Sequence, residues 1–322
     1  MIGIKEPTAM GEIPARSAVC ALYDGDYHLG VGCLVNSLYR NGFRGTVWVG
    51  YRGPLPPWAQ PVQSGATFDE FTVADGCSIR FVQLSLTTHL ANAKPDFMLA
   101  VLTDHSPDAE AVFYFDVDIV IKCRWSFFEA WVTRGVALCL DAAYPYMPAS
   151  HPLRGPWQDL IRKLELKYRD VDGYVNSGFV GATRQNKNFL ESWAKLVRLL
   201  PNEGVSLDDW QLGDRTHPFN NVEQDMLNVA LMATNTPISV AGPEAMDFTP
   251  AGYIMSHAVL SPKPWARNYL WWAANGVSPT TADKMYWHYA DGPIQFCSKS
   301  RIALQRAQLK LAAAIGRFYR RS

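Results

Sequence analysis

Two aspartates interrupt an apolar stretch near the middle of the 322-residue chain. The stretch from 112 to 121 is typical of a buried strand, with Asp116 and Asp118 in its second half. Alternation along a strand places both carboxylates on one face and Val117 on the other. Two carboxylates in apolar surroundings need a neutralising cation, so the pair is predicted to hold Mn²⁺ or Mg²⁺ and, through it, a diphosphate. The alternative is a strand that ends at two solvated acids.

A late histidine and lysine could serve the same metal and diphosphate. His257 stands in apolar company, where a lone histidine is usually a core residue, but Lys263 follows six residues later between Pro262 and Pro264. An imidazole that ligates a metal and an ammonium that binds phosphate would suit one diphosphate–metal complex at this spacing.

Three other polar segments could contact a ligand. Lys94 precedes a predicted helix with proline in its first turn, and it could reach a nucleotide phosphate or be solvated. Small polar residues in the predicted strand 174–181 would let ligand hydroxyls approach the backbone. Glu223 and Asp225 lie in the first turn of a predicted helix, where interaction with the helix dipole is the alternative to ligand binding.

Strands and helices alternate around these residues. The pattern predicts strands at 17–23, 46–51, 79–84, 112–121, 136–141 and 174–181, and helices at 30–39, 95–102, 188–200 and 222–231. The segments between them include a proline- and glycine-rich loop, an aromatic excursion ending in a helix to about residue 168, and a long polar loop; they are 53–75, 142–170 and 201–221. This order predicts an α/β domain whose ligand lies beyond the carboxyl ends of the strands. The only nearby Gly-x-Gly, at 30–32, lies too far past the first strand for a dinucleotide fingerprint.

The composition predicts a globular domain with a basic appendage. The chain is 48% hydrophobic and 19% charged, with zero formal net charge. Residues 299–322 hold seven basic side chains and no acid, which leaves 23 basic and 30 acidic residues in the body. We therefore predict a main domain at 1–297 and a basic amphipathic tail at 298–322, and we expect no nucleic-acid binding by the whole chain. The six scattered cysteines and the lack of a signal peptide or membrane span favour a cytoplasmic location.

The tail is predicted to form an amphipathic helix. One face would carry Arg306, Lys310, Arg317, Arg320 and Arg321, and the opposite side Leu304, Leu311, Ala314, Ile315 and Phe318, whereas Ile302 and Leu309 fit this division less well. Such a helix can lie on an anionic membrane surface, here the inner face of the membrane. The alternative is that its apolar stripe packs on the acidic body of the protein.

Six blocks, in this order, resemble retaining glycosyltransferases of family 8, which include glycogenin-like and lipooligosaccharide galactosyltransferase-like enzymes. The blocks are Ala21-Leu22-Tyr23-Asp24 with Tyr27, Lys94 at a helix start, Asp116-Val117-Asp118, Asn176-Ser177-Gly178, Gln224-Asp225-Met226-Leu227-Asn228, and His257 with Lys263-Pro264-Trp265. The resemblance covers roughly residues 17 to 270. It implies a GT-A fold, a Rossmann-like α/β architecture with a mixed central sheet.

The resemblance also implies residue roles. Asp116, Asp118 and His257 would hold the metal on the donor diphosphate, Lys263 would bind phosphate, and Lys94 would face the nucleotide or sugar. The uridine pocket would be lined by Ala21, Tyr23 and Asp24, and the donor sugar and acceptor by Asn176, Ser177, Glu223, Gln224 and Asp225. Two positions depart from the family pattern: Leu260 replaces a glycine and Glu223 replaces an aspartate.

The expected activity is metal-dependent transfer of a hexose from a UDP-sugar to a saccharide or lipid-linked saccharide, with retention, in bacterial surface polysaccharide or lipopolysaccharide synthesis. A covalent carboxylate intermediate and a front-face attack both remain open. A sugar-phosphate nucleotidyltransferase is disfavoured because residues 23–27 are acidic where that class has a glycine-rich basic loop. A non-catalytic binding protein would be expected to lose its metal ligands, yet both acids and the histidine are present.

Overall fold

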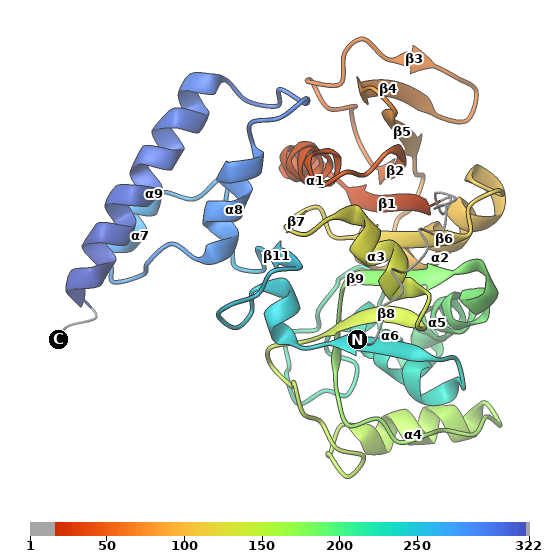
Figure 1. Ribbon diagram of the computed structural model, residues 1–322. Helices are drawn as coiled ribbons and strands as arrows, with labels where there is room; N and C mark the ends of the chain where they lie inside the picture. The colour runs from red at the N-terminus through yellow and green to blue at the C-terminus, as the bar shows by residue number, and fades with distance from the viewer. Residues whose placement is uncertain (1–16, 320–322) are drawn as a thin grey trace, which may run out of the picture.

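The computed structural model describes residues 17–319, and within them nine strands form one mixed sheet (Figure 1). Their order across the sheet is β10-β8-β9-β6-β1-β2-β5-β4-β3. The strands are β1 (Ser17–Tyr23), β2 (Gly45–Tyr51), β3 (Gln63–Ser64), β4 (Asp69–Ala74), β5 (Cys77–Gln83), β6 (Ala111–Phe115), β8 (Val136–Leu140), β9 (Val175–Thr183) and β10 (Ile238–Ala241). Because β9 is antiparallel to both β6 and β8, and β6 is parallel to β1, the carboxyl ends of β1, β6 and β8 meet at the edge where β9 begins.

Helices cover both faces of the sheet, as the α/β prediction requires. Alternate residues of β6 enter two separate cores: Phe113 and Phe115 pack on one side, and Val112 and Tyr114 on the other. The first core is covered by α1 (His28–Arg40) and α3 (Trp125–Val132). The second core is covered by α2 (Lys94–Ala100), α4 (Arg154–Lys163), α5 (Lys187–Leu199) and α6 (Val222–Ala233).

A second, two-stranded sheet brings distant segments of the chain together. The short strand β7 (Ile119–Ile121) pairs antiparallel with β11 (Met255–His257), and Ile119 lies opposite His257. The prediction of one continuous strand from 112 to 121 is wrong, because the chain turns between β6 and β7 with the Ile119 N–H donating to the Asp116 carbonyl at 3.0 Å. A turn, not strand alternation, therefore presents the two aspartates.

Three element boundaries also differ from the prediction. The expected loop at 53–75 contains β3 and β4, whose side chains are mostly exposed or half-buried, so they lack the apolar run of a core strand. The helix expected to reach residue 168 ends at Lys163, and Glu165 has a positive φ of 57°. The helix expected to reach residue 102 gives way to a π-helical turn at Val101–His105.

Three helices form a layer beside the sheet, at the left of Figure 1: α7 (Tyr269–Ala274), α8 (Thr281–Tyr289) and α9 (Lys299–Tyr319). The tail is helical as predicted, but the face that packs on α7 and α8 is built on Ile302, Leu309 and Ala312. The predicted stripe instead leaves Leu304 57% and Leu311 53% exposed. The side chain of Phe318, and the residues Arg320 and Arg321, lie outside the described part of the chain. Among residues 17–319, no helix is long and apolar enough to cross a membrane.

Candidate active site

Asp116, Asp118 and His257 converge at the carboxyl edge of the sheet. The His257 Nε2 atom lies 3.2 Å from Asp118 Oδ1 and 3.8 Å from Asp116 Oδ2. The Ala258 N–H donates to the Asp118 carbonyl at 3.0 Å, so pairing of β7 with β11 fixes the imidazole beside the turn. One ligand atom from each residue lies within 4.8 Å of the others. Two carboxylates and one imidazole are a suitable donor set for Mn²⁺ or Mg²⁺.

Asp118 is buried and ionised. Burial opposes its negative charge, but His257 and Lys263 hold the pKa of Asp118 well below its usual range. The Lys263 Nζ atom lies 2.6 Å from Asp118 Oδ2 and donates to the Ala258 carbonyl at 3.0 Å. The predicted phosphate-binding lysine and the predicted metal ligands therefore lie together.

These groups line a cavity of about 770 Å³, within the range of small-molecule sites. Tyr23 and Asp24 line it as well, and Arg52 fixes the Asp24 carboxylate by a 2.6 Å ion pair. The cavity wall also includes Lys94, Asn176, Ser177, Glu223, Gln224 and Asp225. Ala21, which was predicted to line the uridine pocket, is fully buried in the first core and is not part of this wall.

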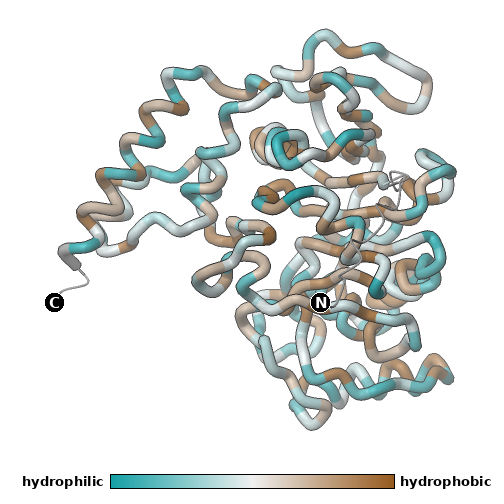
Figure 2. Tube along the Cα trace, in the orientation of Figure 1, coloured by the Kyte–Doolittle hydropathy of each residue, from teal (hydrophilic) through white to brown (hydrophobic). Residues whose placement is uncertain are grey.

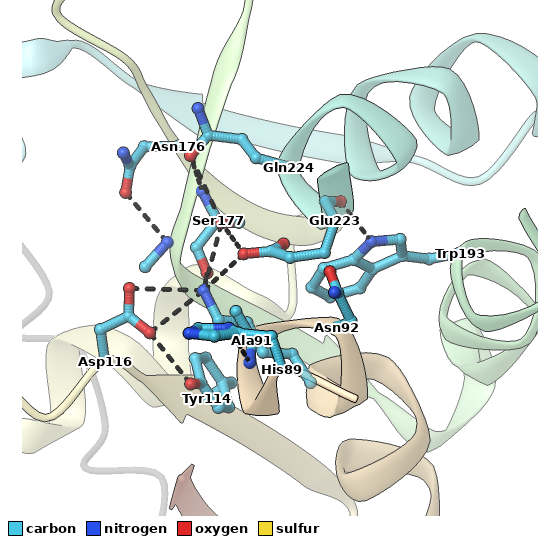
Figure 3. Close-up of polar contacts among 12 residues, drawn as sticks. His89, Ala91, Asn92, Tyr114, Asp116, Asn176, Ser177, Trp193, Glu223 and Gln224 are labelled. Carbon is cyan, nitrogen blue, oxygen red and sulfur yellow. Dashed lines mark hydrogen bonds and ion pairs between the residues drawn. The ribbon is translucent and has the colours of Figure 1, made fainter. Parts of the chain in front are cut away.

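A buried lysine links Asp116 to the start of α6. Lys94 is 4% exposed, and its Nζ atom lies 2.7 Å from Glu223 Oε1, 3.1 Å from Asp116 Oδ1 and 3.2 Å from Ser177 Oγ. Figure 3 shows Asp116, Ser177 and Glu223 facing one another across this contact. Burial alone would lower the pKa of Lys94, but the two carboxylates raise it above its usual range. The alternative of a solvated Lys94 is wrong, because its ammonium group is buried and paired with Asp116 and Glu223.

Glu223 and Gln224 present hydrogen-bonding atoms to the cavity. Glu223 Oε1 accepts from Lys94 and from Ser177 Oγ, each at 2.7 Å. Its Oε2 atom is buried and has no hydrogen-bond partner among the described residues. Gln224 is oriented by the Ser177 N–H, which donates to its Oε1 at 3.0 Å, and by its own Nε2, which donates to the Tyr174 hydroxyl at 3.0 Å. Glu223 is therefore more than a favourable charge at a helix start.

Asp225 does close the start of α6, as the dipole alternative proposed, and it also forms a buried pair with Tyr174. It accepts from the Asn221 N–H and from the Tyr174 hydroxyl, each at 2.7 Å. Burial raises the pKa of Asp225 to about 8, although these donors lower it in part. The folded protein thus holds a proton that the unfolded chain releases above its ordinary pKa of 3.8.

The free energy of unfolding should consequently fall as pH rises from about 4 to about 8, by at most about 1.4 kcal/mol per pH unit from this group. Asp225→Asn keeps the shape of the side chain but has no carboxyl group to titrate. In this variant the contribution of residue 225 to the pH dependence of the free energy of unfolding should disappear. Denaturant unfolding across the pH range measures it, with the exposed Asp208→Asn as control. Parallel stability profiles for wild type and Asp225→Asn would contradict the assignment.

Gly178 leaves room for His257, the candidate metal ligand. A Cβ atom at this position would collide with His257 Cε1 and would lie 2.9 Å from its Nδ1 and 2.8 Å from Asn176 Oδ1. We expect Gly178→Ala to displace the imidazole and raise the Mn²⁺ concentration for half-maximal activity at least about tenfold. The matched control is Gly155→Ala on α4, where a Cβ meets no atom within 4 Å. Equal metal dependence of the two variants would show that the imidazole is not displaced.

Asp141 is a cavity residue that the sequence analysis did not single out. It follows β8 directly, and its Oδ2 accepts from Asn176 Nδ2 at 2.7 Å and from Gln224 Nε2 at 3.4 Å. The signal was present in the sequence: like Asp24 and Asp116, it is an acid placed just after a buried strand. Tyr114 donates to Asp116 Oδ1 at 2.9 Å. The sequence did not indicate this contact, because Tyr114 lies within an apolar strand where it reads as a core residue.

Comparisons with known protein families and with curated proteins find no match for the sequence. Comparison of the structure finds 248 matching chains of solved structures. One is the apo structure of WbbM, described as a bifunctional glycosyltransferase, with a TM-score of 0.52 and 13% sequence identity. The match covers 95% of this chain but 53% of that one, so the chain spans about half the length of this neighbour.

At 13% sequence identity, the similarity to this neighbour shows the fold alone. The large mixed sheet between helical layers agrees with it, and so does the site at the carboxyl edge, where two acids and a histidine come together. The predicted α/β architecture is confirmed, and the chain has a glycosyltransferase fold of the GT-A kind.

Proposed function

We propose that the protein is a metal-dependent glycosyltransferase that moves a hexose from a UDP-sugar to a saccharide acceptor. The observation that carries the proposal is the convergence of Asp116, Asp118 and His257, with Lys263 beside them, in the cavity that Glu223 and Gln224 also line. A sugar nucleotide needs both halves of such a site: cationic groups at its diphosphate and hydrogen-bonding groups at its hexose.

The diphosphate would be held at the acidic turn. Asp116, Asp118 and His257 would bind Mn²⁺ or Mg²⁺, which neutralises charge on the departing nucleoside diphosphate. Lys263 already stands at Asp118 and would donate to a phosphate oxygen. Tyr23 and Asp24, at the end of β1, would face the uridine.

The hexose would lie against the start of α6. Oε2 of Glu223 is buried without a hydrogen-bond partner among the described residues, and a sugar hydroxyl would supply one, while Lys94 and Ser177 hold Oε1 in place. Gln224 has an amide fixed by Ser177 and Tyr174, so it is oriented before a ligand arrives. Carboxylate and amide oxygens of this kind stabilise the positive charge that develops at the anomeric carbon. Retention would follow from a covalent intermediate or from front-face attack.

A panel of UDP-sugars tests the proposal. Slow hydrolysis of one donor, dependent on added Mn²⁺, is the expected result, and proton NMR of the first-formed product should show the anomer of the donor. Absence of turnover with every UDP-hexose would overturn the donor assignment. An inverted product from an α-linked donor would overturn retention alone.

The tail helix α9 would hold the enzyme on an anionic membrane surface at the cytoplasmic face. Its outer side carries Leu304, Ala307, Leu311 and Ala314, all exposed, next to the exposed Lys310 and Arg317. Hydrophilic and hydrophobic segments alternate along it in Figure 2. An apolar stripe beside cations suits a headgroup boundary. Arg306, which was predicted on the basic face, would not bind the membrane, because it donates to the Trp287 and His288 carbonyls.

This location would suit an acceptor that is a lipid-linked saccharide, as used in surface polysaccharide or lipopolysaccharide synthesis. Residues 298–322 would then be an appendage to a catalytic domain that ends at residue 297. Co-sedimentation with phosphatidylglycerol vesicles should fall severalfold in Lys310→Glu/Arg317→Glu, because each cation near such a surface contributes about 1 kcal/mol. The control is Lys167→Glu/Lys195→Glu, the same charge change at exposed positions elsewhere. Equal loss in both variants, or no binding by wild type, would contradict the anchor.

A further inference from the structure

The long loop before α6 forms an ordered wall of the cavity. At its start, the His89 N–H donates to the Leu207 carbonyl at 2.8 Å, and Asn92 Nδ2 donates to the Leu207 and Asp209 carbonyls at 2.8 and 3.1 Å. At its end, Gln211 Nε2 donates to Asn221 Oδ1 at 3.0 Å. These bonds tie the loop to the segment before α2 and to the start of α6, so its backbone is anchored at both ends.

Trp210 offers an aromatic face next to the proposed transfer site. Its backbone carbonyl accepts from the Val222 N–H at 3.1 Å, which places it beside the turn that carries Glu223 and Gln224. The side chain lines the cavity and is nevertheless 54% exposed. A large apolar ring left exposed in a cavity wall is suited to stack on the apolar face of a pyranose ring.

Among residues 17–319, Arg215 is the one cavity-lining lysine or arginine without a hydrogen bond or ion pair. Of the lysines and arginines that line the cavity, Lys94 is paired with Glu223 and Asp116, and Lys263 with Asp118. Arg215, by contrast, is exposed and forms no hydrogen bond or ion pair within residues 17–319. The neighbouring Asp214 carboxylate is occupied by Thr216, whose N–H and hydroxyl donate to it at 2.9 and 2.7 Å.

We propose that Trp210 and Arg215 form the acceptor subsite and that the acceptor is an anionic glycoside. Trp210 stacks on the acceptor ring, and the Arg215 guanidinium binds its carboxylate or phosphate. The neutral hydroxyl groups of the acceptor then face Gln224 and Asp141 at the inner end of the wall. This inference rests on the proposed glycosyltransferase function, and it adds the charge of the second substrate.

Transfer and binding to matched glycosides test the subsite. The probes are 4-nitrophenyl β-D-glucoside as the neutral form, 4-nitrophenyl β-D-glucuronide as the carboxylate, and 4-nitrophenyl β-D-glucoside 6-phosphate as the phosphate. Wild type should use one anionic probe at least about tenfold better in kcat/KM than the neutral one, and the better of the two tells carboxylate from phosphate. Arg215→Gln should lose that preference while use of the neutral probe changes less than about twofold.

Trp210→Ala should weaken use of all three probes, and the distant Arg134→Gln serves as the charge control. Donor hydrolysis without acceptor should be unchanged in Arg134→Gln. Calorimetric binding of the probes in the presence of UDP and Mn²⁺ reports on the subsite even if no UDP-sugar turns over, so failure of the proposed function remains distinguishable. The subsite is disproved if wild type neither binds nor uses an anionic probe better than the neutral one, or if Arg215→Gln keeps the preference.

Discussion

Replacing Asp118 by asparagine should lower sugar transfer at least about a hundredfold while the fold stays intact. Asp118 is the acid on which His257 and Lys263 both converge, at 3.2 and 2.6 Å. Asparagine keeps its shape and one oxygen but removes the negative charge that a divalent cation needs. Initial rates at several Mn²⁺ concentrations, together with thermal unfolding, measure both effects.

The control for this change is Asp104→Asn, which neutralises an exposed aspartate outside the cavity. A chelator should abolish wild-type activity, and added Mn²⁺ should restore it. Undiminished turnover in Asp118→Asn, or full activity with chelator present, would mean that the acidic turn holds no catalytic metal.

Replacing Lys94 by methionine should cost about 3–5 kcal/mol of stability, because it leaves Glu223 buried and without its counter-charge. The Lys94 Nζ to Glu223 Oε1 distance is 2.7 Å, and both side chains are almost completely buried. The double variant Lys94→Met/Glu223→Gln should regain much of this loss, since the uncompensated charge is gone. It should not regain activity, because Asp116 would still lack the lysine that holds it.

Denaturant unfolding of both single variants and the double variant gives the coupling energy. The control is Lys163→Met, which breaks an ion pair with Glu203 of the same 2.7 Å length but with the lysine 62% exposed, and which should cost less than about 1 kcal/mol. Similar losses of stability in Lys94→Met and Lys163→Met would show that burial of the Lys94–Glu223 pair does not increase its contribution to the free energy of unfolding.

The sequence predicted the architecture well where strands are long and apolar. The strands β1, β2, β5, β8 and β9 were expected close to where they lie, because each contains several large apolar residues within five to nine positions. The small sheet of β7 and β11 could not be foreseen, since strands of three residues have no periodicity to read. That sheet carries His257 to Asp118. Residue types and spacing could suggest that the two serve one metal, but not which backbone pairing brings them together.

Long-range pairing explains what was missed at the site. Lys94 looked like a solvated or ligand-binding lysine because Glu223, its partner, is 129 residues away in the chain. On the tail, a helical wheel placed Leu304 and Leu311 in the apolar stripe, but it could not show that α7 and α8 cover Ile302 and Leu309 instead. Trp210 and Arg215 lie in a loop without regular structure, where the sequence gives residue types but not neighbours.

The central claim is that the acidic turn and the late histidine form one metal site. Electron paramagnetic resonance of Mn²⁺ titrated into the protein tests it without any assumption about the sugar. We expect one bound Mn²⁺ per wild-type chain, with a lower dissociation constant when UDP is added. In Asp118→Asn we expect only the signal of free Mn²⁺. Equal Mn²⁺ binding by wild type and Asp118→Asn, or none by either with UDP present, would contradict it.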